Sequence, residues 1–93
     1  MNGNCPIRRT VTVANPHGLH MRPATAFATY ARQFACKISV FNGPNRADGK
    51  SSLDLILLVA LPGAELTVEV DGADAEKAIG PLAELLSSPG DGL

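Results

Sequence analysis

Long apolar runs are absent from this 93-residue chain, and cysteine, histidine and aromatic residues are scarce. The longest apolar run, residues 55–61, is far shorter than the ~20 residues that a helix needs to span a membrane. The first six residues contain no apolar segment of the kind that secretory signal peptides carry. We therefore expect no membrane insertion and a cytoplasmic location.

Two cysteines and two histidines give little material for a disulfide or a metal site. Cys5 and Cys36 are too far apart for a Cys-x-x-Cys motif and too few for a disulfide framework. We expect two free thiols, with Cys36 as a small residue of the core. The spacing of His17 and His20 suits a pair of metal ligands, but no carboxylate or cysteine lies close in sequence to complete a set. No metal and no cofactor are therefore expected.

The composition fits one small globular domain. Hydrophobic residues make up 45% of the chain and the net charge is −1, which argues against disorder. Aromatic residues make up 4% and basic residues are few, which argues against a nucleic-acid partner. We expect a single domain over residues 1–93, with a core over about residues 7–87 and frayed termini.

Charge is divided unevenly along the chain. Through Lys50 the sequence carries seven basic residues and one acidic residue, whereas the remainder carries eight acidic residues and one basic residue. If the fold brings Arg22, Arg32 and Lys50 near one another, they form a positive face. Such a face speeds the encounter with acidic partners.

The spacing of apolar residues predicts four strands and three helices. Strands are expected over residues 7–14, 37–41, 46–48 and 65–71. Helices are expected over residues 21–34, over a short segment that follows Ser51, and over residues 74–87. Each strand has one apolar face, so the order β-α-β-β-α-β-α predicts an α+β fold with three helices on one face of a four-stranded, mainly antiparallel sheet.

Three local signals refine these helices. Ser51 with Asp54 three residues later resembles a capping box. Asp74 is a suitable N-cap for the last helix. Gly80 and Pro81 interrupt the pattern of that helix, and because proline lacks an N–H we expect a kink or a break there.

Residues 18–24, with the sequence Gly-Leu-His-Met-Arg-Pro-Ala, are the most informative segment. They place His20 at an expected helix start, where backbone N–H groups and the helix dipole favour an anion. A neutral imidazole is a nucleophile toward phosphorus, and the guanidinium of Arg22 could pair with phosphoryl oxygens. Pro23 is tolerated in a first turn. The segment predicts a site that takes up a phosphoryl group on His20 and releases it, with His17 as a turn residue beside it.

The segment that follows the third strand has a structural and a functional interpretation. Ser51 suits a helix N-cap, and it also suits a phosphorylation target next to Lys50 at a helix start. The two roles are compatible. Leu53, Ile56 and Leu57 make the short helix apolar nearly all round, so at least one of the three is expected to be exposed to a partner.

The same residues carry a resemblance to a known family. Residues 16–24 (Pro-His-Gly-Leu-His-Met-Arg-Pro-Ala) resemble the site of HPr, the histidine-containing phosphocarrier family of the bacterial phosphoenolpyruvate-dependent sugar phosphotransferase system. Lys50 and Ser51 match the family's Lys-Ser pair at the family's interval from the histidine. The resemblance covers about residues 7–87 without gaps, and it implies the open-faced β-sandwich of that family.

The resemblance also implies a function. His20 would accept a phosphoryl group on Nδ1 from enzyme I, which phosphoenolpyruvate charges, and would pass it to the A domain of a sugar-specific enzyme II. Arg22 would hold the phosphoryl oxygens, and in many bacteria an HPr kinase/phosphorylase would modify Ser51. The chain would be a monomeric carrier with a covalent phosphohistidine rather than a stand-alone enzyme. Its partner-binding residues would be Met21, Arg22, Thr25, Arg32, Ser52, Leu53, Ile56 and Leu57.

Five positions depart from the pattern of that family. Ser52 is polar where an aliphatic residue is usual, and Asp54 is acidic where lysine or glycine is common. Val59 replaces a usual glycine, and Gly80 with Pro81 is unusual in the last helix. None lies in the histidine motif. Ser52 and Asp54 leave open a specialised paralogue, of the nitrogen branch or regulatory, that acts mainly through protein contacts.

Overall fold

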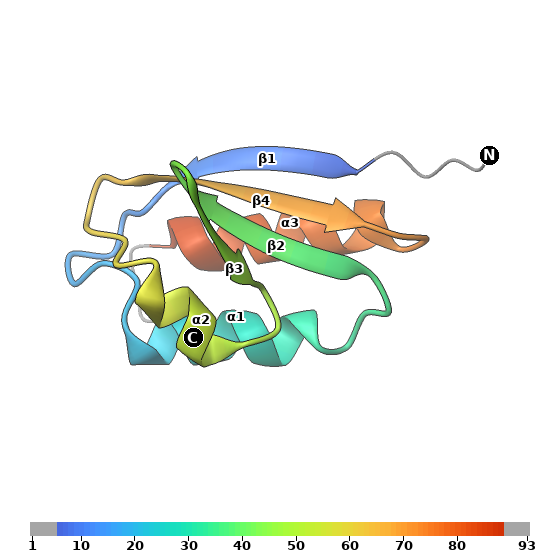
Figure 1. Ribbon diagram of the computed structural model, residues 1–93, viewed down its shortest axis with the longest axis horizontal. Helices are drawn as coiled ribbons and strands as arrows, with labels where there is room; N and C mark the ends of the chain where they lie inside the picture. Colours follow the sequence, from blue (N-terminus) through green and yellow to red (C-terminus); the bar gives the residue numbers. More distant parts are fainter. Residues whose placement is uncertain (1–5, 89–93) are drawn as a thin grey trace.

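The computed structural model describes residues 6–88, which form four strands and three helices in the predicted order (Figure 1). The strands are β1 (Ile7–Thr12), β2 (Lys37–Asn42), β3 (Asn45–Asp48) and β4 (Glu65–Asp71). The helices are α1 (Met21–Ala31), α2 (Ser52–Leu57) and α3 (Ala75–Ser87).

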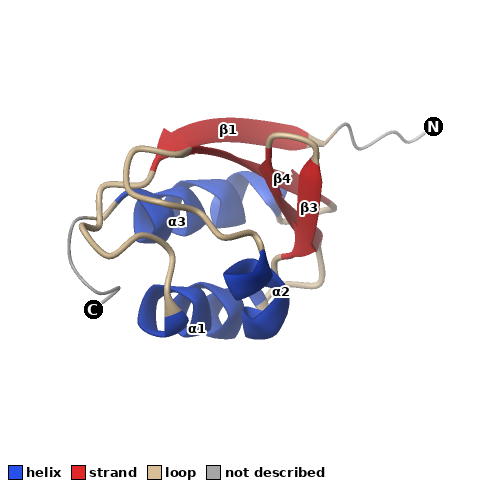
Figure 2. Cartoon of the chain, turned by 60° about the vertical axis from the view of Figure 1, so that its left-hand side comes forward, coloured by secondary structure: helices blue, strands red, loops and turns tan. Residues whose placement is uncertain are grey.

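The strands form one sheet in the order β1-β4-β2-β3, and every neighbouring pair is antiparallel. In the central strand β4 the apolar residues Leu66, Val68 and Val70 are fully buried and alternate with more exposed polar residues, as their sequence predicts. Figure 2 shows the sheet as one layer and the three helices together beneath it. The fold is therefore the expected α+β open-faced sandwich.

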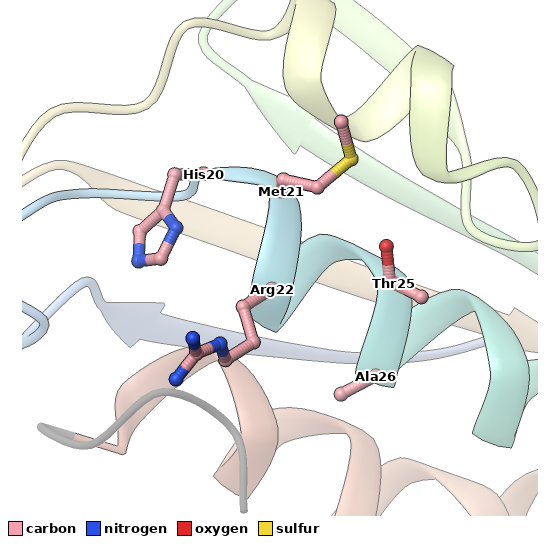
Figure 3. A pocket seen from close by; sticks show the side chains of 5 residues that line it. All are labelled: His20, Met21, Arg22, Thr25 and Ala26. Carbon is pink, nitrogen blue, oxygen red and sulfur yellow. The ribbon is translucent and has the colours of Figure 1, made fainter.

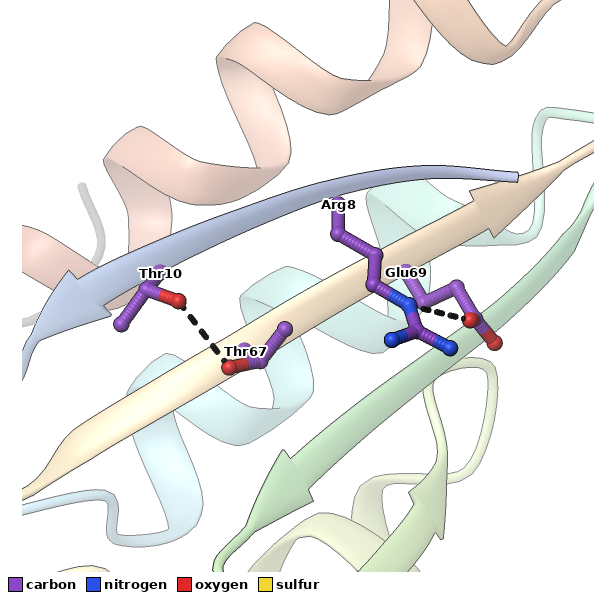
Figure 4. Close-up of polar contacts among 4 residues, drawn as sticks. All are labelled: Arg8, Thr10, Thr67 and Glu69. Atoms are coloured by element: carbon purple, nitrogen blue, oxygen red, sulfur yellow. Dashed lines mark hydrogen bonds and ion pairs between the residues drawn. The ribbon is translucent and has the colours of Figure 1, made fainter. Parts of the chain in front are cut away.

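The open face of the sheet carries polar pairs that join β1 to β4 (Figure 4). Arg8 lies opposite Glu69, and its Nε donates to the carboxylate over 2.7 Å. Two residues further along β1, Thr10 lies opposite Thr67, and their hydroxyl oxygens are 3.1 Å apart. Cross-strand pairs of this kind fix the register of an edge strand, although an exposed ion pair contributes only about 0–1 kcal/mol.

The core lies between the sheet and the helices. Phe27 of α1, Leu55 of α2 and Leu82 of α3 are fully buried against the inner face of the sheet. Cys36 is a buried free thiol at 3% exposure, as predicted. The prediction for Cys5 and the expected fraying of the termini lie outside the described residues. The burial of Phe27, two turns into α1, fixes that helix against the sheet.

Two elements end earlier than the sequence predicts. β1 ends at Thr12 rather than at residue 14, and Val13 instead bonds to the turn before β4, where its N–H donates to the Ala64 carbonyl over 2.9 Å. α1 ends at Ala31 rather than at residue 34, because the N–H groups of Gln33 and Phe34 bond to carbonyls three residues back. This tightening of a last turn leaves the apolar spacing almost unchanged, so periodicity does not reveal it.

α3 continues through Pro81 as one helix, so of the predicted kink or break, the break is wrong. Proline in a helix interior costs ~3 kcal/mol through its missing donor. Ala78, Ile79 and Leu82 on either side are buried. Burial of a large side chain such as Ile79 or Leu82 contributes ~1.5–3 kcal/mol. Packing therefore outweighs the lost hydrogen bond. Asp74 does occupy the N-cap position, but its side chain makes no capping bond.

Candidate functional site

The loop between β1 and α1 is held in one conformation by Asn15. The side chain of Asn15 is 3% exposed, and its Oδ1 accepts the N–H of His17 over 2.8 Å. The Asn15 carbonyl accepts the N–H of Gly18 over 2.9 Å. This combination of an Asx turn and a β-turn reverses the chain. Asn15 is thus a positioning residue that the sequence marks only as part of a turn.

Gly18 brings the loop against the segment that follows α2. Its φ is +72°, and a Cβ built at this position would lie 2.5 Å from the carbonyl oxygen of Ala60. The next residue, Leu19, donates its N–H to the same oxygen over 2.9 Å. Only glycine combines a favourable positive φ with the absence of a Cβ that would clash with the Ala60 carbonyl. The chain directly before His20 is therefore fixed to residues 60–62.

His20 is the N-cap of α1, which confirms the predicted helix start. Its backbone is extended, with φ −105° and ψ −168°, and its carbonyl accepts the N–H of Ala24 over 3.0 Å as the first helical bond. No acidic residue lies in the first turn of this helix. The positive end of the helix dipole is therefore not offset by a nearby carboxylate in that turn.

The imidazole of His20 is partly buried and oriented by its surroundings. Its Nε2 is shielded from solvent, and its ring meets the ring of His17 edge to face, with centroids 5.7 Å apart and an interplanar angle of 89°. Figure 3 shows Nδ1, the nitrogen next to the ring attachment, on the side of the start of α1. Nδ1 is therefore the ring nitrogen on the side of the helix start.

A hollow of about 580 Å³ opens at this point, lined by His20, Met21, Arg22, Thr25 and Ala26 (Figure 3). The guanidinium of Arg22 reaches toward the side on which the His20 ring lies, whereas Met21 points toward α2. The first four residues are among the predicted site residues. Ala26 was missed, because a methyl group gives no chemical signal and only its position one turn after Arg22 brings it into the wall.

Ser51 is the N-cap of α2, as the sequence predicts. Its Oγ accepts the N–H of Asp54 over 3.2 Å. The second bond of a capping box is not made, because the Asp54 carboxylate accepts the N–H of Asp48 over 3.2 Å instead. Asp54, one of the residues that departs from the family pattern, therefore ties the first turn of α2 to the end of β3.

Arg32 and Lys50 are joined to each other across the end of α1. The Arg32 Nε donates to the Lys50 carbonyl over 2.9 Å, and the Lys50 Nζ donates to the Phe34 carbonyl over 2.6 Å. Arg22 lies in the first turn of the same helix, ten residues before Arg32, which places it ~15 Å away along the axis. The three cations therefore spread along α1 and do not gather beside the histidine.

The remaining predicted partner residues lie on α2, which packs beside α1. Leu53 and Leu57 are 66% and 67% exposed, which confirms that at least one of the apolar residues of this helix faces solvent. Ser52 and Ile56 are half-buried. α2 therefore presents an apolar stripe next to the start of α1.

Two properties of the described residues bear on metals and membranes. No group of three or more His, Cys, Asp or Glu side chains within residues 6–88 could hold a metal ion. In the same range, no helix is both long enough and apolar enough to cross a membrane.

The fold is that of a small α+β protein, with a four-stranded antiparallel sheet and three helices on one face. The histidine at the N-cap position of the first helix marks a candidate phosphoryl site. A family profile described as the PTS HPr component phosphorylation site matches residues 7–88. The chain belongs to the HPr family, the phosphocarriers of the phosphotransferase system, as its sequence motif predicts.

Individual relatives cover nearly the whole chain. The phosphocarrier protein HPr of Neisseria meningitidis is 32% identical over 81 residues, which are 87% of this chain and 91% of that protein. The phosphocarrier protein NPr of Shewanella violacea is 33% identical over 85 residues, or 91% of this chain and 93% of its own length. The crystal structure of HPr from Bacillus anthracis superposes with a TM-score of 0.84 at 28% identity, covering 90% of this chain and all of that one.

Proposed function

We propose that His20 carries the phosphoryl group, which it accepts from phospho-enzyme I and delivers to the A domain of a sugar-specific enzyme II. The observation that carries this proposal is the place of His20 as the N-cap of α1, at the edge of a hollow that Arg22 also lines. A single domain that works as a monomer in the cytoplasm is part of the same proposal, by analogy with the family.

The chemical step needs only the imidazole and the donor. The lone pair of Nδ1 attacks the phosphorus of a phosphohistidine on the donor, a P–N bond forms at His20, and the P–N bond of the donor breaks. The electron pair returns to the donor ring, which leaves as neutral imidazole, while His20 keeps its proton on Nε2. Delivery to the next partner is the same exchange in reverse. The shielding of Nε2 from solvent supports Nδ1 as the reacting atom.

The start of α1 would stabilise the transferred group moderately. The backbone N–H groups of Met21 and Arg22 stand in the first turn, whereas Pro23 has none to offer. The helix dipole contributes ~0.3–1 kcal/mol at an exposed site, and a guanidinium adds charge-assisted bonds. Because Arg22 is exposed, these contributions are screened by water. Moderate stabilisation suits a carrier that must release what it holds.

We further propose that Ser51 is a regulatory phosphorylation site on the same docking surface. Its hydroxyl lies at the start of α2, and Lys50 precedes it. A phosphate there would place negative charge on a face that meets acidic partners, which slows phosphoryl uptake at His20. The docking face itself comprises Met21, Arg22, Thr25, Arg32, Ser52, Leu53, Ile56 and Leu57.

A second candidate is a specialised carrier of the nitrogen branch or a regulatory paralogue. The carboxylate of Asp54 stands one turn from Ser51, where it would repel a phosphate on that serine. Similarity to a protein named NPr supports the same alternative. Parallel transfer assays with sugar-branch and nitrogen-branch enzymes I decide between the two, because the cognate donor gives the higher kcat/KM.

Incubation with phosphoenolpyruvate and enzyme I tests the phosphoryl site. The unmodified chain should become a phosphoprotein whose label is lost in acid and retained in base, and His20→Ala should abolish the label. His17→Ala is the matched control, since the chain has two histidines, and it should keep the label. Labelling of the His20→Ala variant would show that the assignment is wrong.

A further inference from the structure

A hollow lined by basic side chains lies beyond the end of α1, whereas His20 stands at the start of that helix. Its volume is about 360 Å³, and its wall is formed by residues 35–38, which lead from α1 into β2, together with Arg46, Asp48 and Lys50. This volume lies at the lower end of the range for small-ligand sites, about 300–1,000 Å³. The hollow is therefore large enough for a small ligand and separate from the phosphoryl site.

The side chains that line this hollow carry a net positive charge. Lys37, Arg46 and Lys50 are basic, and Asp48 is the acidic residue among those that line it. The Asp48 carboxylate is already engaged, because its Oδ1 accepts the N–H of Lys50 over 2.9 Å. Asp71 lies opposite Lys37 on β4 but forms no ion pair with it. Among residues 6–88, the side chains of Lys37 and Arg46 make no hydrogen bond or ion pair, so their donors are available to a ligand.

Lys50 is held in place by contacts within the chain. It is half-buried, and its Nζ donates to the Phe34 carbonyl over 2.6 Å. An ammonium group has three donors, so two remain for a ligand. The preceding residue, Gly49, donates its N–H to the Ile38 carbonyl over 2.8 Å, and a Cβ on it would lie 2.5 Å from the Ile38 Cγ2. The close packing of this glycine on β2 fixes the backbone at Lys50, so one cation of the hollow is preorganised.

We propose that this hollow binds a phosphate group, supplied by a small phosphorylated metabolite or by free phosphate, between Lys37, Arg46 and Lys50. A guanidinium pairs with two phosphate oxygens at once, and each ammonium adds a compact charge. A phosphate offers three or four oxygens to these cations, whereas a carboxylate offers two. Because Lys37 and Arg46 are exposed, water screens their charges, and the expected dissociation constant is about 1 mM.

Titration of the ¹⁵N-labelled chain with glycerol 3-phosphate at constant ionic strength tests the site. The amide signals of residues 35–38 and 46–50 should shift in the NMR spectrum along one saturating curve, which gives the dissociation constant. The start of α1 also favours an anion, and the amides of Met21 and Arg22 report on it separately. Shifts confined to the start of α1 would overturn the inference.

Charge variants distinguish a built site from general attraction of anions. Arg46→Gln removes the paired donors and should weaken binding about tenfold, whereas Arg46→Lys keeps the charge and should restore part of the affinity. Lys77→Gln on α3 removes one charge elsewhere and should bind as the unmodified chain does. Both positions are exposed, so neither substitution should change the melting temperature without ligand. Equal weakening in Arg46→Gln and Lys77→Gln would overturn the inference.

A parallel titration with inorganic phosphate identifies the source of the phosphate group. Tighter binding of glycerol 3-phosphate would assign a phosphorylated metabolite, and equal binding would assign free phosphate; either result supports the site. If neither compound shifts the amides of residues 35–38 and 46–50 at about 20 mM, well above the expected dissociation constant, the inference is wrong. The titration needs no enzyme I, so its failure would leave the proposed function of His20 untouched.

Discussion

At the scale of single residues, Gly18 has the most demanding position near the histidine. A Cβ there would lie 2.5 Å from the Ala60 carbonyl oxygen, and φ is +72°. We predict that Gly18→Ala lowers the free energy of unfolding by about 2–3 kcal/mol, since the strain of a left-handed alanine and a backbone clash act together. It should also slow the labelling of His20, because the chain before that residue must move. Urea denaturation and the phosphorylation assay measure the two effects.

Gly43→Ala is the matched control for that substitution. Gly43 has a φ of +60°, but a Cβ at its position would meet nothing within 4 Å. Its replacement should therefore cost only the conformational strain, about 1–2 kcal/mol, and should leave the labelling rate unchanged. Equal losses of stability in the two variants would show that the contact with Ala60 contributes nothing.

The residues of the candidate phosphoryl site are neighbours in sequence. His20 and Arg22 share one helix start, so a local motif is enough to place them together. Asn15 is different, since its role depends on burial of its side chain in the folded loop. Val59 departs from the family pattern, but its exposure and its positive φ depend on how the chain leaves α2 and cannot be predicted from the neighbouring residues.

At the scale of elements, α3 shows where local rules and packing disagree. Proline and glycine both disfavour a helix interior, yet the helix passes through Gly80 and Pro81 without interruption. The apolar positions of α3 bury its inner face against the sheet and α1, and that burial is a tertiary effect that propensity does not include. The tightened last turn of α1 leaves the apolar spacing almost unchanged, and the capping box of α2 is incomplete because the Asp54 carboxylate accepts the N–H of Asp48.

The same helix offers a stabilising substitution. Apart from its two chain neighbours and the backbone of its own helix, a Cβ at Gly80 would meet the Arg9 Nη1 at 4.0 Å, which is an ordinary van der Waals contact. We predict that Gly80→Ala raises the free energy of unfolding by about 0.5–1 kcal/mol, because alanine restricts the unfolded chain and favours the helix. Urea denaturation measures it, with the phosphorylation assay expected to be unchanged. A loss of stability would mean that the added Cβ is too close to the ring of Pro81 or to Arg9.

At the scale of the whole molecule, the sheet joins strands that are far apart in sequence. β4 lies between β1 and β2, so the order of the strands follows from long-range pairing and not from succession along the chain. The alternation in β4 predicts which of its residues face inward, but it does not predict which two strands pair with β4. The bond from Arg32 to the Lys50 carbonyl also spans 18 residues, so the distribution of charge could be assessed only in the folded molecule.

That distribution leads to a prediction about ionic strength. Arg22 and Arg32 lie at the two ends of α1, and Lys50 lies beside Arg32. Acidic residues are concentrated on β4 and α3. A positive docking face speeds the approach of an acidic partner, and salt screens this attraction. Raising NaCl from about 0.05 M to about 0.5 M should therefore lower kcat/KM for transfer from phospho-enzyme I several-fold, with kcat unchanged.

Two charge variants show whether the salt effect comes from the docking face. Arg32→Gln removes one cation of that face, so it should lower kcat/KM at low salt and reduce the response to NaCl. Lys77→Gln on α3 removes the same charge elsewhere and should behave as the unmodified chain does. Initial rates at several salt concentrations measure both. An equal loss in the two variants would mean that net charge, rather than the face along α1, guides the partner to His20.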